Sequence, residues 1–143
     1  MLVAVLVNPD AGLGGVLAYK GSDGLADEAR KAGAEERSGP RTRRALARFS
    51  VISERMPNLD VKWMVGARRM GEDWWPDDIT IERVLGAEIV SDITSSEDTM
   101  RMVSEAIDVG VDLIVYAGGD GTTRDVVAAL SEHPEGPSTP ILG

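Results

Sequence analysis

The chain has 143 residues, a length typical of one compact domain, and its formal net charge at pH 7 is −9. Because an acidic surface repels polyanions, this charge argues against nucleic acid and against an anionic membrane as the main partner. There is no cysteine, which excludes disulfides and thiolate metal sites, so a bound metal would need oxygen ligands. No apolar run approaches the roughly 20 residues that cross a bilayer, and we expect a soluble, cytoplasmic protein.

The first part of the chain indicates one buried strand followed by helices. Residues 2–7, LVAVLV, form a continuous apolar run, which is typical of a strand buried on both faces. The stretch 25–56 is charged and rich in helix formers, and we expect two helices with a break near Gly39 and Pro40. Residues 61–65, VKWMV, predict the second strand.

The middle of the chain is harder to assign. Residues 87–90, AEIV, predict a short third strand. The preceding stretch, residues 66–84, has no clear period. We expect Trp74, Trp75 and Pro76 to pin it to the body of the protein.

The last third alternates helices and strands. Thr94 and Glu97 resemble a capping box that opens a helix, and Gly110 closes that helix. A buried strand (DLIVYA), a helix (TRDVVAALSE) and the start of another strand (PILG) follow in this order. This alternation predicts a single α/β domain over residues 1–143, built as a three-layer αβα sandwich with a mostly parallel sheet.

The sequence GGDGTT, residues 118–123, follows the strand DLIVYA and opens a helix. In open parallel sheets, ligands bind beyond the carboxyl ends of the strands. Glycines let the backbone approach a phosphate, and the free amides and positive dipole end of a helix favour an anion. Thr122 or Thr123 would cap the helix or donate a hydrogen bond to a phosphate oxygen.

Asp120 is the unusual member of this motif, because a phosphate repels a neighbouring carboxylate. Two roles would explain its presence: accepting the proton of an attacking hydroxyl, or holding Mg²⁺. Either role favours phosphoryl transfer. The alternative is a tight turn in which Asp120 only caps its helix.

Three motifs in a fixed order carry a resemblance to a known family: VNPDAGLGG at 7–15, KGSDG at 20–24 and YAGGDGTTRD at 116–125. Together they resemble the ATP-NAD kinase-like group that includes the acetoin-catabolism protein X, within the NAD kinase and diacylglycerol kinase superfamily. The resemblance implies ATP as phosphate donor, Mg²⁺ as its metal and NAD as the favoured acceptor. It also implies that Asp120 is the general base on the acceptor's hydroxyl.

The resemblance further implies which residues bind nucleotide phosphates. They are Gly118, Gly119, Gly121 and Thr122, together with Asn8 and the turn of Gly12, Gly14 and Gly15. Lys20, in a segment that the family shares, and Arg124, on the first turn of the last helix, are further candidates for phosphate contact. Asp23 is an additional candidate in the same loop as Lys20.

A β-rich carboxyl-terminal domain follows this domain in the family and is absent from these 143 residues. We therefore expect a truncated fragment that binds nucleotide weakly and does not catalyse alone. The full-length protein is expected to bind a small-molecule nucleotide and to form a homo-oligomer.

Other interpretations stay open. One is a nucleotide-sensing module that binds without transferring phosphate. A lipid kinase is disfavoured at this stage, because no stretch of the sequence predicts an amphipathic basic surface for a bilayer. The basic run RTRRALAR, residues 41–48, either steers an anionic nucleotide or is an exposed helix face that offsets nearby carboxylates.

Overall fold

The protein is built around one parallel β-sheet. A computed structural model describes residues 1–13, 26–89, 91 and 93–143. Within these residues the sheet has five strands in the order β3-β2-β1-β4-β5, and each neighbouring pair is parallel. The strands are β1 (Leu2–Val7), β2 (Lys62–Gly66), β3 (Ile81–Leu85), β4 (Leu113–Ala117) and β5 (Ile141–Leu142).

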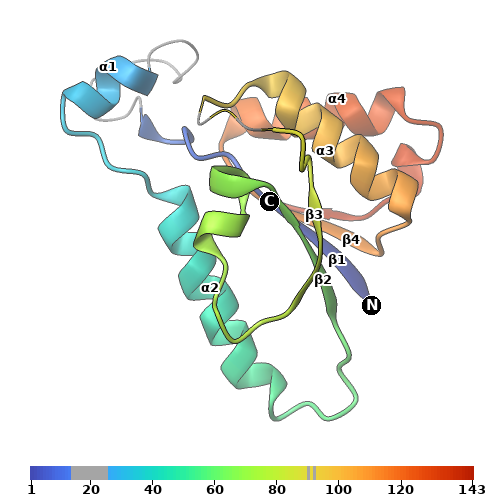
Figure 1. The fold of residues 1–143 in the computed structure, drawn as a ribbon. Helices are drawn as coiled ribbons and strands as arrows, with labels where there is room; N and C mark the ends of the chain where they lie inside the picture. Colours follow the sequence, from blue (N-terminus) through green and yellow to red (C-terminus); the bar gives the residue numbers. More distant parts are fainter. Residues whose placement is uncertain (14–25, 90, 92) are drawn as a thin grey trace.

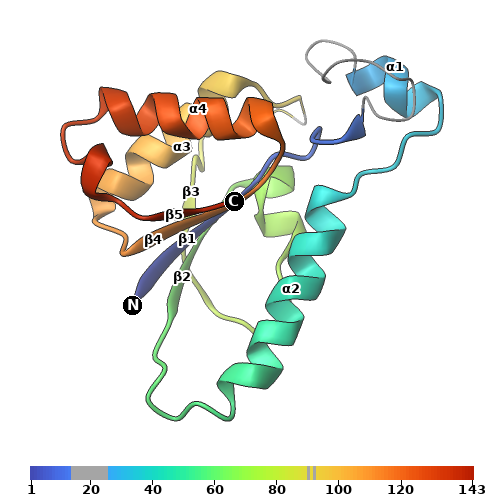
Figure 2. The ribbon, with the colours of Figure 1, turned by 180° about the vertical axis from the view of Figure 1, so that it is seen from behind.

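Helices cover both faces of the sheet (Figures 1 and 2). Helices α3 (Ser96–Val109) and α4 (Asp120–Glu132) lie on one face, and α2 (Ser38–Ser53) lies on the other. The short helix α1 (Ala26–Lys31) stands near the carboxyl end of β1. Three 3₁₀ turns complete the described elements: η2 (Arg68–Met70), η3 (Glu72–Trp74) and η4 (Gly136–Ser138). The predicted three-layer αβα sandwich is confirmed.

The apolar core is divided by the sheet into two clusters. Successive residues of a strand face opposite sides, so Ala4 of β1 packs with α3 and α4, while Val3 packs with Leu46 of α2 and with Trp63. Trp75 joins the second cluster, where its ring meets the ring of Trp63 edge-on at 5.6 Å between centroids. The prediction that the tryptophans pin the segment before β3 to the body is therefore confirmed.

The strand order places a topological switch point between β1 and β4. From β1 the chain adds β2 and β3 on one side, and α3 then returns it across the sheet to β4 on the other side. The two strands end in register, with Val7 opposite Ala117. The backbone N–H of Asn8 extends this pairing by donating to the carbonyl of Ala117 at 2.8 Å. In doubly wound sheets such a point is where ligands bind.

The third strand was predicted at the wrong place. β3 occupies Ile81–Leu85, whereas Gly86 to Glu88 form a turn. β3 is an edge strand whose Glu82 and Arg83 are exposed, so it lacks the continuous apolar run that marks a buried strand. Ile89, which suggested a strand, instead packs into the core from the turn.

Two predicted helix boundaries also need correction. The break between the first two helices lies at residues 32–37, and Gly39 and Pro40 belong to the first turn of α2. Proline is tolerated there because its missing N–H would have no partner inside the helix. The capping box of α3 is formed by Ser95 and Asp98, one residue later than predicted, while Gly110 closes the helix with φ +78° as expected.

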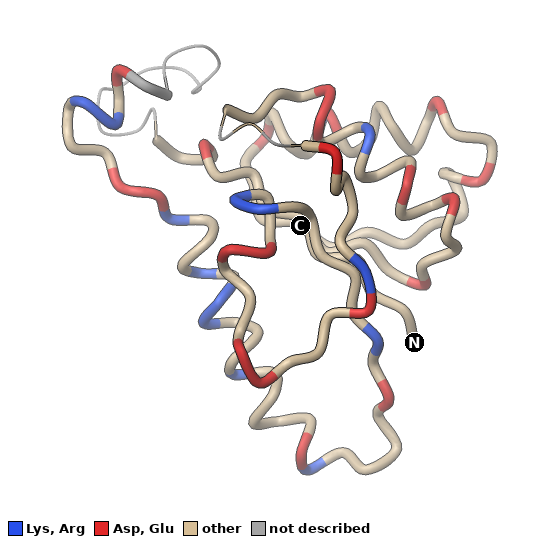
Figure 3. The backbone as a smooth tube through the Cα atoms, viewed as in Figure 1, with Lys and Arg blue, Asp and Glu red and all other residues tan. Residues whose placement is uncertain are grey.

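The basic run RTRRALAR lies on α2, which contains no acidic residue (Figure 3). Leu46 packs inward against the sheet, and Arg43 contacts the segment after β2, where it donates to the carbonyl of Trp75 at 3.2 Å. The other arginines of the run are exposed. The run is therefore an exposed helix face, although Arg43 alone of its arginines pairs with a described carboxylate, Asp77 at 3.7 Å. That the run steers an anionic nucleotide stays a prediction.

Two glycine substitutions test this packing. A Cβ on Gly39 would overlap the indole ring of Trp74, whereas a Cβ on Gly121 in α4 would have no neighbour closer than 3.8 Å. We expect Gly39→Ala to lower the free energy of unfolding by about 1–3 kcal/mol through overpacking. Gly121→Ala should raise it by about 0.5–1 kcal/mol, because alanine restricts the unfolded chain. Urea unfolding followed by circular dichroism measures both, and equal effects of the two variants would contradict the packing.

Candidate functional site

The glycine loop after β4 is open to solvent. Gly118, Gly119 and Asp120 are exposed, and α4 begins directly behind them with Gly119 as its N-cap. No side chain caps this helix, and among the described residues the backbone amides of Asp120, Gly121 and Thr122 have no acceptor. Three free N–H groups at the positive end of a helix dipole are suited to bind an anion.

The carboxylate of Asp120 makes no hydrogen bond with its own turn or with the start of its helix. Its side chain is exposed, and no described residue donates a hydrogen bond to it. The alternative interpretation, in which Asp120 only caps α4, is therefore wrong. The carboxylate stands beside the free amides on the solvent side of the loop.

Asn8 ties this loop to the end of β1. Its Nδ2 donates to Oγ1 of Thr122 at 2.8 Å, and its Oδ1 accepts from the backbone N–H of Asp10 at 2.9 Å. Its carbonyl accepts from Oγ of Ser38, at the start of α2, at 2.6 Å. One side chain and its backbone thus hold β1, α2 and α4 together at the switch point.

Thr122 has a structural position within the loop. Only 3 % of its surface is exposed, and Oγ1 accepts the bond from Asn8. Its side chain therefore supports the turn, while its backbone amide is one of the free donors. Thr123 also bonds internally, because its Oγ1 lies 3.1 Å from the carbonyl of Gly119 and accepts from the hydroxyl of Tyr116.

The three glycines of the loop differ in what the fold requires of them. A Cβ on Gly118 would overlap the side chain of Thr122, so the fold itself excludes a larger residue there. A Cβ on Gly119 would have no atom within 4 Å, and the φ of Gly119 is −110°, a value open to any residue. Gly121 has similar room. Glycine is a favoured N-cap residue at position 119, and at both positions the missing side chain also leaves room for a ligand pressed against the backbone.

Other predicted site residues lie around this loop or outside the described chain. Arg124 is exposed, and its Nη2 lies 3.8 Å from the position that a Cβ on Gly121 would take. Gly12 has φ +84° in the turn after β1. Four predicted positions lie outside the described residues: Gly14, Gly15, Lys20 and Asp23.

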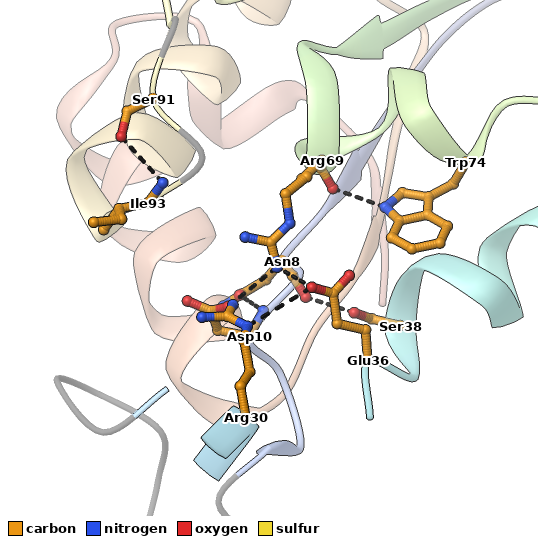
Figure 4. A network of polar contacts seen from close by, with 9 residues as sticks. All are labelled: Asn8, Asp10, Arg30, Glu36, Ser38, Arg69, Trp74, Ser91 and Ile93. Carbon is orange, nitrogen blue, oxygen red and sulfur yellow. Dashed lines mark hydrogen bonds and ion pairs between the residues drawn. The ribbon is translucent and has the colours of Figure 1, made fainter. Parts of the chain in front are cut away.

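A charged cluster adjoins Asn8, and the sequence did not predict it (Figure 4). Arg30 of α1 pairs with Asp10, and Arg69 of η2 pairs with Glu36. Cross contacts at 3.9 Å link Arg30 to Glu36 and Arg69 to Asp10. The cluster therefore joins α1 and η2 to the loop that follows β1.

Burial decides the protonation of Asp10. Desolvation raises the pKa of its carboxyl above the ordinary value of 3.8, and neighbouring Glu36 raises it further. Arg30 and Arg69 lower it, but together they do not offset the combined effect of desolvation and Glu36. The carboxylate is thus held in place at an electrostatic cost even though two guanidinium groups contact it.

In the described part of the chain, no three acidic or histidine side chains lie close enough together to form a metal site. No helix in that part has the length and apolar character needed to cross a membrane.

The fold and the site together define a class: a doubly wound α/β domain with an open glycine loop and free helix amides at its switch point. Residues 3–143 match the family described as ATP-NAD kinase N-terminal domain. The chain belongs to this family, as the motifs predicted.

Curated relatives match shorter parts of the chain. A protein of Xanthomonas campestris pv. campestris (strain 8004) named "Probable lipid kinase YegS-like" is 42 % identical over 67 residues, which are 46 % of this chain and 22 % of that protein. A protein of the same name from Stenotrophomonas maltophilia (strain K279a) is 37 % identical over 73 residues, or 50 % and 24 % of the two chains. The matched segments thus span about a quarter or less of these relatives. No solved structure matches the chain.

The raised pKa of Asp10 gives a testable pH dependence. Between 3.8 and the raised value the folded state binds more protons than the unfolded state, so this group's contribution to stability is greatest below 3.8 and falls as pH rises. Asp10→Asn removes that contribution. We expect the melting temperature of the wild type, relative to Asp10→Asn, to decline as the pH rises above about 4. Asp73→Asn, at an exposed position, controls for net charge, and a difference that is flat or rises with pH would contradict the assignment.

Proposed function

We propose that this chain is the nucleotide-binding domain of a kinase that transfers a phosphoryl group from ATP to a hydroxyl. One observation carries the proposal: three backbone amides without a partner among the described residues and an exposed carboxylate meet at the switch point, framed by Gly119 and Gly121, where a Cβ would meet no close atom. Membership in the ATP-NAD kinase N-terminal domain family supports it. So do the names of the curated relatives, which are probable kinases.

The residues of the loop fit the parts of a phosphoryl transfer. The amides of residues 120–122 and the guanidinium of Arg124 would bind phosphate oxygens of the nucleotide. The carboxylate of Asp120 would accept the proton of the acceptor hydroxyl. As that oxygen forms its bond to the terminal phosphorus, the bond between this phosphorus and the bridging oxygen breaks, and a nucleoside diphosphate leaves.

Magnesium fits this arrangement as a companion of the nucleotide. Mg²⁺ is commonly held by one or two carboxylates together with substrate phosphates, so it needs no cluster of protein ligands. Asp120, an exposed carboxylate at the start of α4, would be its protein ligand, directly or through water, in the alternative in which it does not act as the base. When bound, the ion neutralises charge on the phosphates.

The acceptor has two candidates. The family description names NAD, and NAD is the acceptor that the sequence resemblance favours. The names of the relatives from Xanthomonas and Stenotrophomonas favour a lipid hydroxyl instead. Parallel assays of the full-length gene product with ATP and either NAD or diacylglycerol in vesicles separate the two. Nucleotide binding without either product would support a sensing module and contradict a kinase.

Gly119→Ala tests whether the backbone amides of residues 120–122 bind phosphate. The added methyl meets no protein atom, so the fold should persist, but the methyl would hold a phosphate away from the amides. Loss of one charge-assisted hydrogen bond weakens binding by roughly 10- to 100-fold. Isothermal titration of this chain with ATP and Mg²⁺ measures the effect, with Glu132→Ala, at the far end of α4, as the control. Unchanged affinity in Gly119→Ala would remove the main support for the proposal.

Asp120→Asn tests the proton acceptor. The amide is nearly isosteric but cannot take up the proton, so kcat of the full-length gene product should fall by about 10²- to 10⁴-fold. Nucleotide affinity should change little, because the backbone amides stay in place. Steady-state kinetics and titration with ATP measure the two quantities. Near-normal turnover would exclude Asp120 as the base.

A further inference from the structure

The outer face of α2 carries a stripe of arginines. Arg37, the N-cap residue, and the helical Arg41, Arg44 and Arg48 follow one another at spacings of four, three and four, which place them on one side of a helix. Leu46 on the opposite side packs against the sheet. The blue positions along α2 show how the positive charge gathers there (Figure 3). We call Arg37, Arg41, Arg44 and Arg48 the arginine stripe.

The stripe is not neutralised within the described part of the protein. None of its four guanidinium groups has a carboxylate within ion-pair distance among the residues described, whereas neighbouring Arg43 pairs with Asp77 at 3.7 Å. α2 itself contains no acidic residue. A chain with a formal charge of −9 therefore keeps four positive charges together on one exposed surface.

Apolar side chains extend the same face. Val51 and Ile52 lie three and four residues after Arg48 and therefore on the same side of the helix, and each is 45 % exposed. Met56, just beyond the helix, is 49 % exposed. An uncovered apolar group at the end of a basic stripe has no role in the core of the sandwich, where Leu46 and Phe49 make the contacts.

We propose that this face of α2 docks onto an anionic lipid bilayer. The four guanidinium groups match the phosphates of acidic lipids, and Val51 and Ile52 match the apolar layer beneath the headgroups. A bilayer is flat and would meet this face of the helix, whereas the carboxylates that contact α2, Asp77 and Asp78, do so through Arg43 and Ser50, which lie outside the stripe. A nucleic acid would match the arginines but would leave the apolar side chains without a partner.

Docking through α2 has a consequence for the glycine loop. The helix starts beside that loop, because Ser38 bonds to the carbonyl of Asn8, which contacts Thr122. The stripe therefore begins at the end of the molecule where the free amides lie. This proposal departs from the expectation of no membrane partner, which rested on the net charge of −9 and on the lack of a predicted basic amphipathic surface. The docking does not rest on the proposed kinase function, and its test does not measure phosphate transfer.

Vesicle sedimentation tests the docking with this chain. Wild-type protein should sediment with phosphatidylglycerol vesicles and not with phosphatidylcholine vesicles. At about 1 kcal/mol per arginine, each lost charge weakens binding about fivefold, so Arg44→Gln with Arg48→Gln should weaken it roughly 25-fold. The control removes the same charge elsewhere: Arg83→Gln with Arg101→Gln, two exposed side chains of β3 and α3. This control should change binding less than about twofold.

Further variants and a DNA control distinguish binding to a lipid bilayer from binding to other polyanions. Arg44→Lys with Arg48→Lys keeps the charge and should restore binding, and Ile52→Ser should reduce the binding that survives in high salt. Circular dichroism confirms that each exposed variant folds. The proposal is overturned if the wild type does not sediment with anionic vesicles, or if substitution of the control pair weakens binding as much as substitution of Arg44 and Arg48. It is also overturned if short duplex DNA binds the stripe more tightly than the vesicles do.

Discussion

The hydrogen bond from Asn8 to Thr122 is the constraint on which the site depends. It joins residues 114 positions apart across the switch point, and it lies directly beyond the last paired residues of β1 and β4. Such a bond contributes only about 0.5–1.5 kcal/mol to stability. Its larger effect is geometric, because it fixes the first turn of α4 relative to β1. With Thr122 facing inward, the first amides of α4 keep no partner among the described residues. The site is thus a by-product of how two strand ends are joined.

An acidic chain that binds an anion must solve an electrostatic problem locally. The helix dipole and the free amides do so at the glycine loop without any net charge. The adjoining cluster of Asp10, Arg30, Glu36 and Arg69 contains equal numbers of acids and bases, so it stabilises the loop after β1 without adding repulsion. Burial of the Asp10 carboxylate in this cluster costs desolvation energy, and this cost raises the pKa of Asp10. The arginines of α2, which take no part in this cluster, lie on the face of the sheet opposite α3 and α4 (Figure 3).

The sequence predicted those elements whose signal is local and strong. β1 and β4 are continuous apolar runs, and the glycine motif that follows β4 is contiguous, so both were placed correctly. β3 was missed because an edge strand with Glu82 and Arg83 exposed does not show the pattern of a buried strand. The charged cluster was missed because its members are brought together only by the fold; Arg30 meets Asp10 across 20 residues and Arg69 meets Glu36 across 33. The family resemblance implied that Asn8 binds phosphate; its hydrogen bond to Thr122 was not predicted, since no local pattern joins the two residues.

The residues of the glycine loop are there for different reasons, so the motif alone does not show which of them serve a ligand. Gly118 is small because Thr122 needs the space, which is a requirement of the fold and would hold in a protein that binds nothing. Gly119 has room for a Cβ but occupies the N-cap of α4, where glycine is favoured. Gly121 also has room and lies inside the helix, where glycine costs conformational entropy. This cost at Gly121 is consistent with a ligand that needs the space beside the backbone. The same logic applies to Asp120, which makes no hydrogen bond with its own turn and yet stands beside a site for anions. Function is therefore indicated most clearly by the residues that the fold does not need.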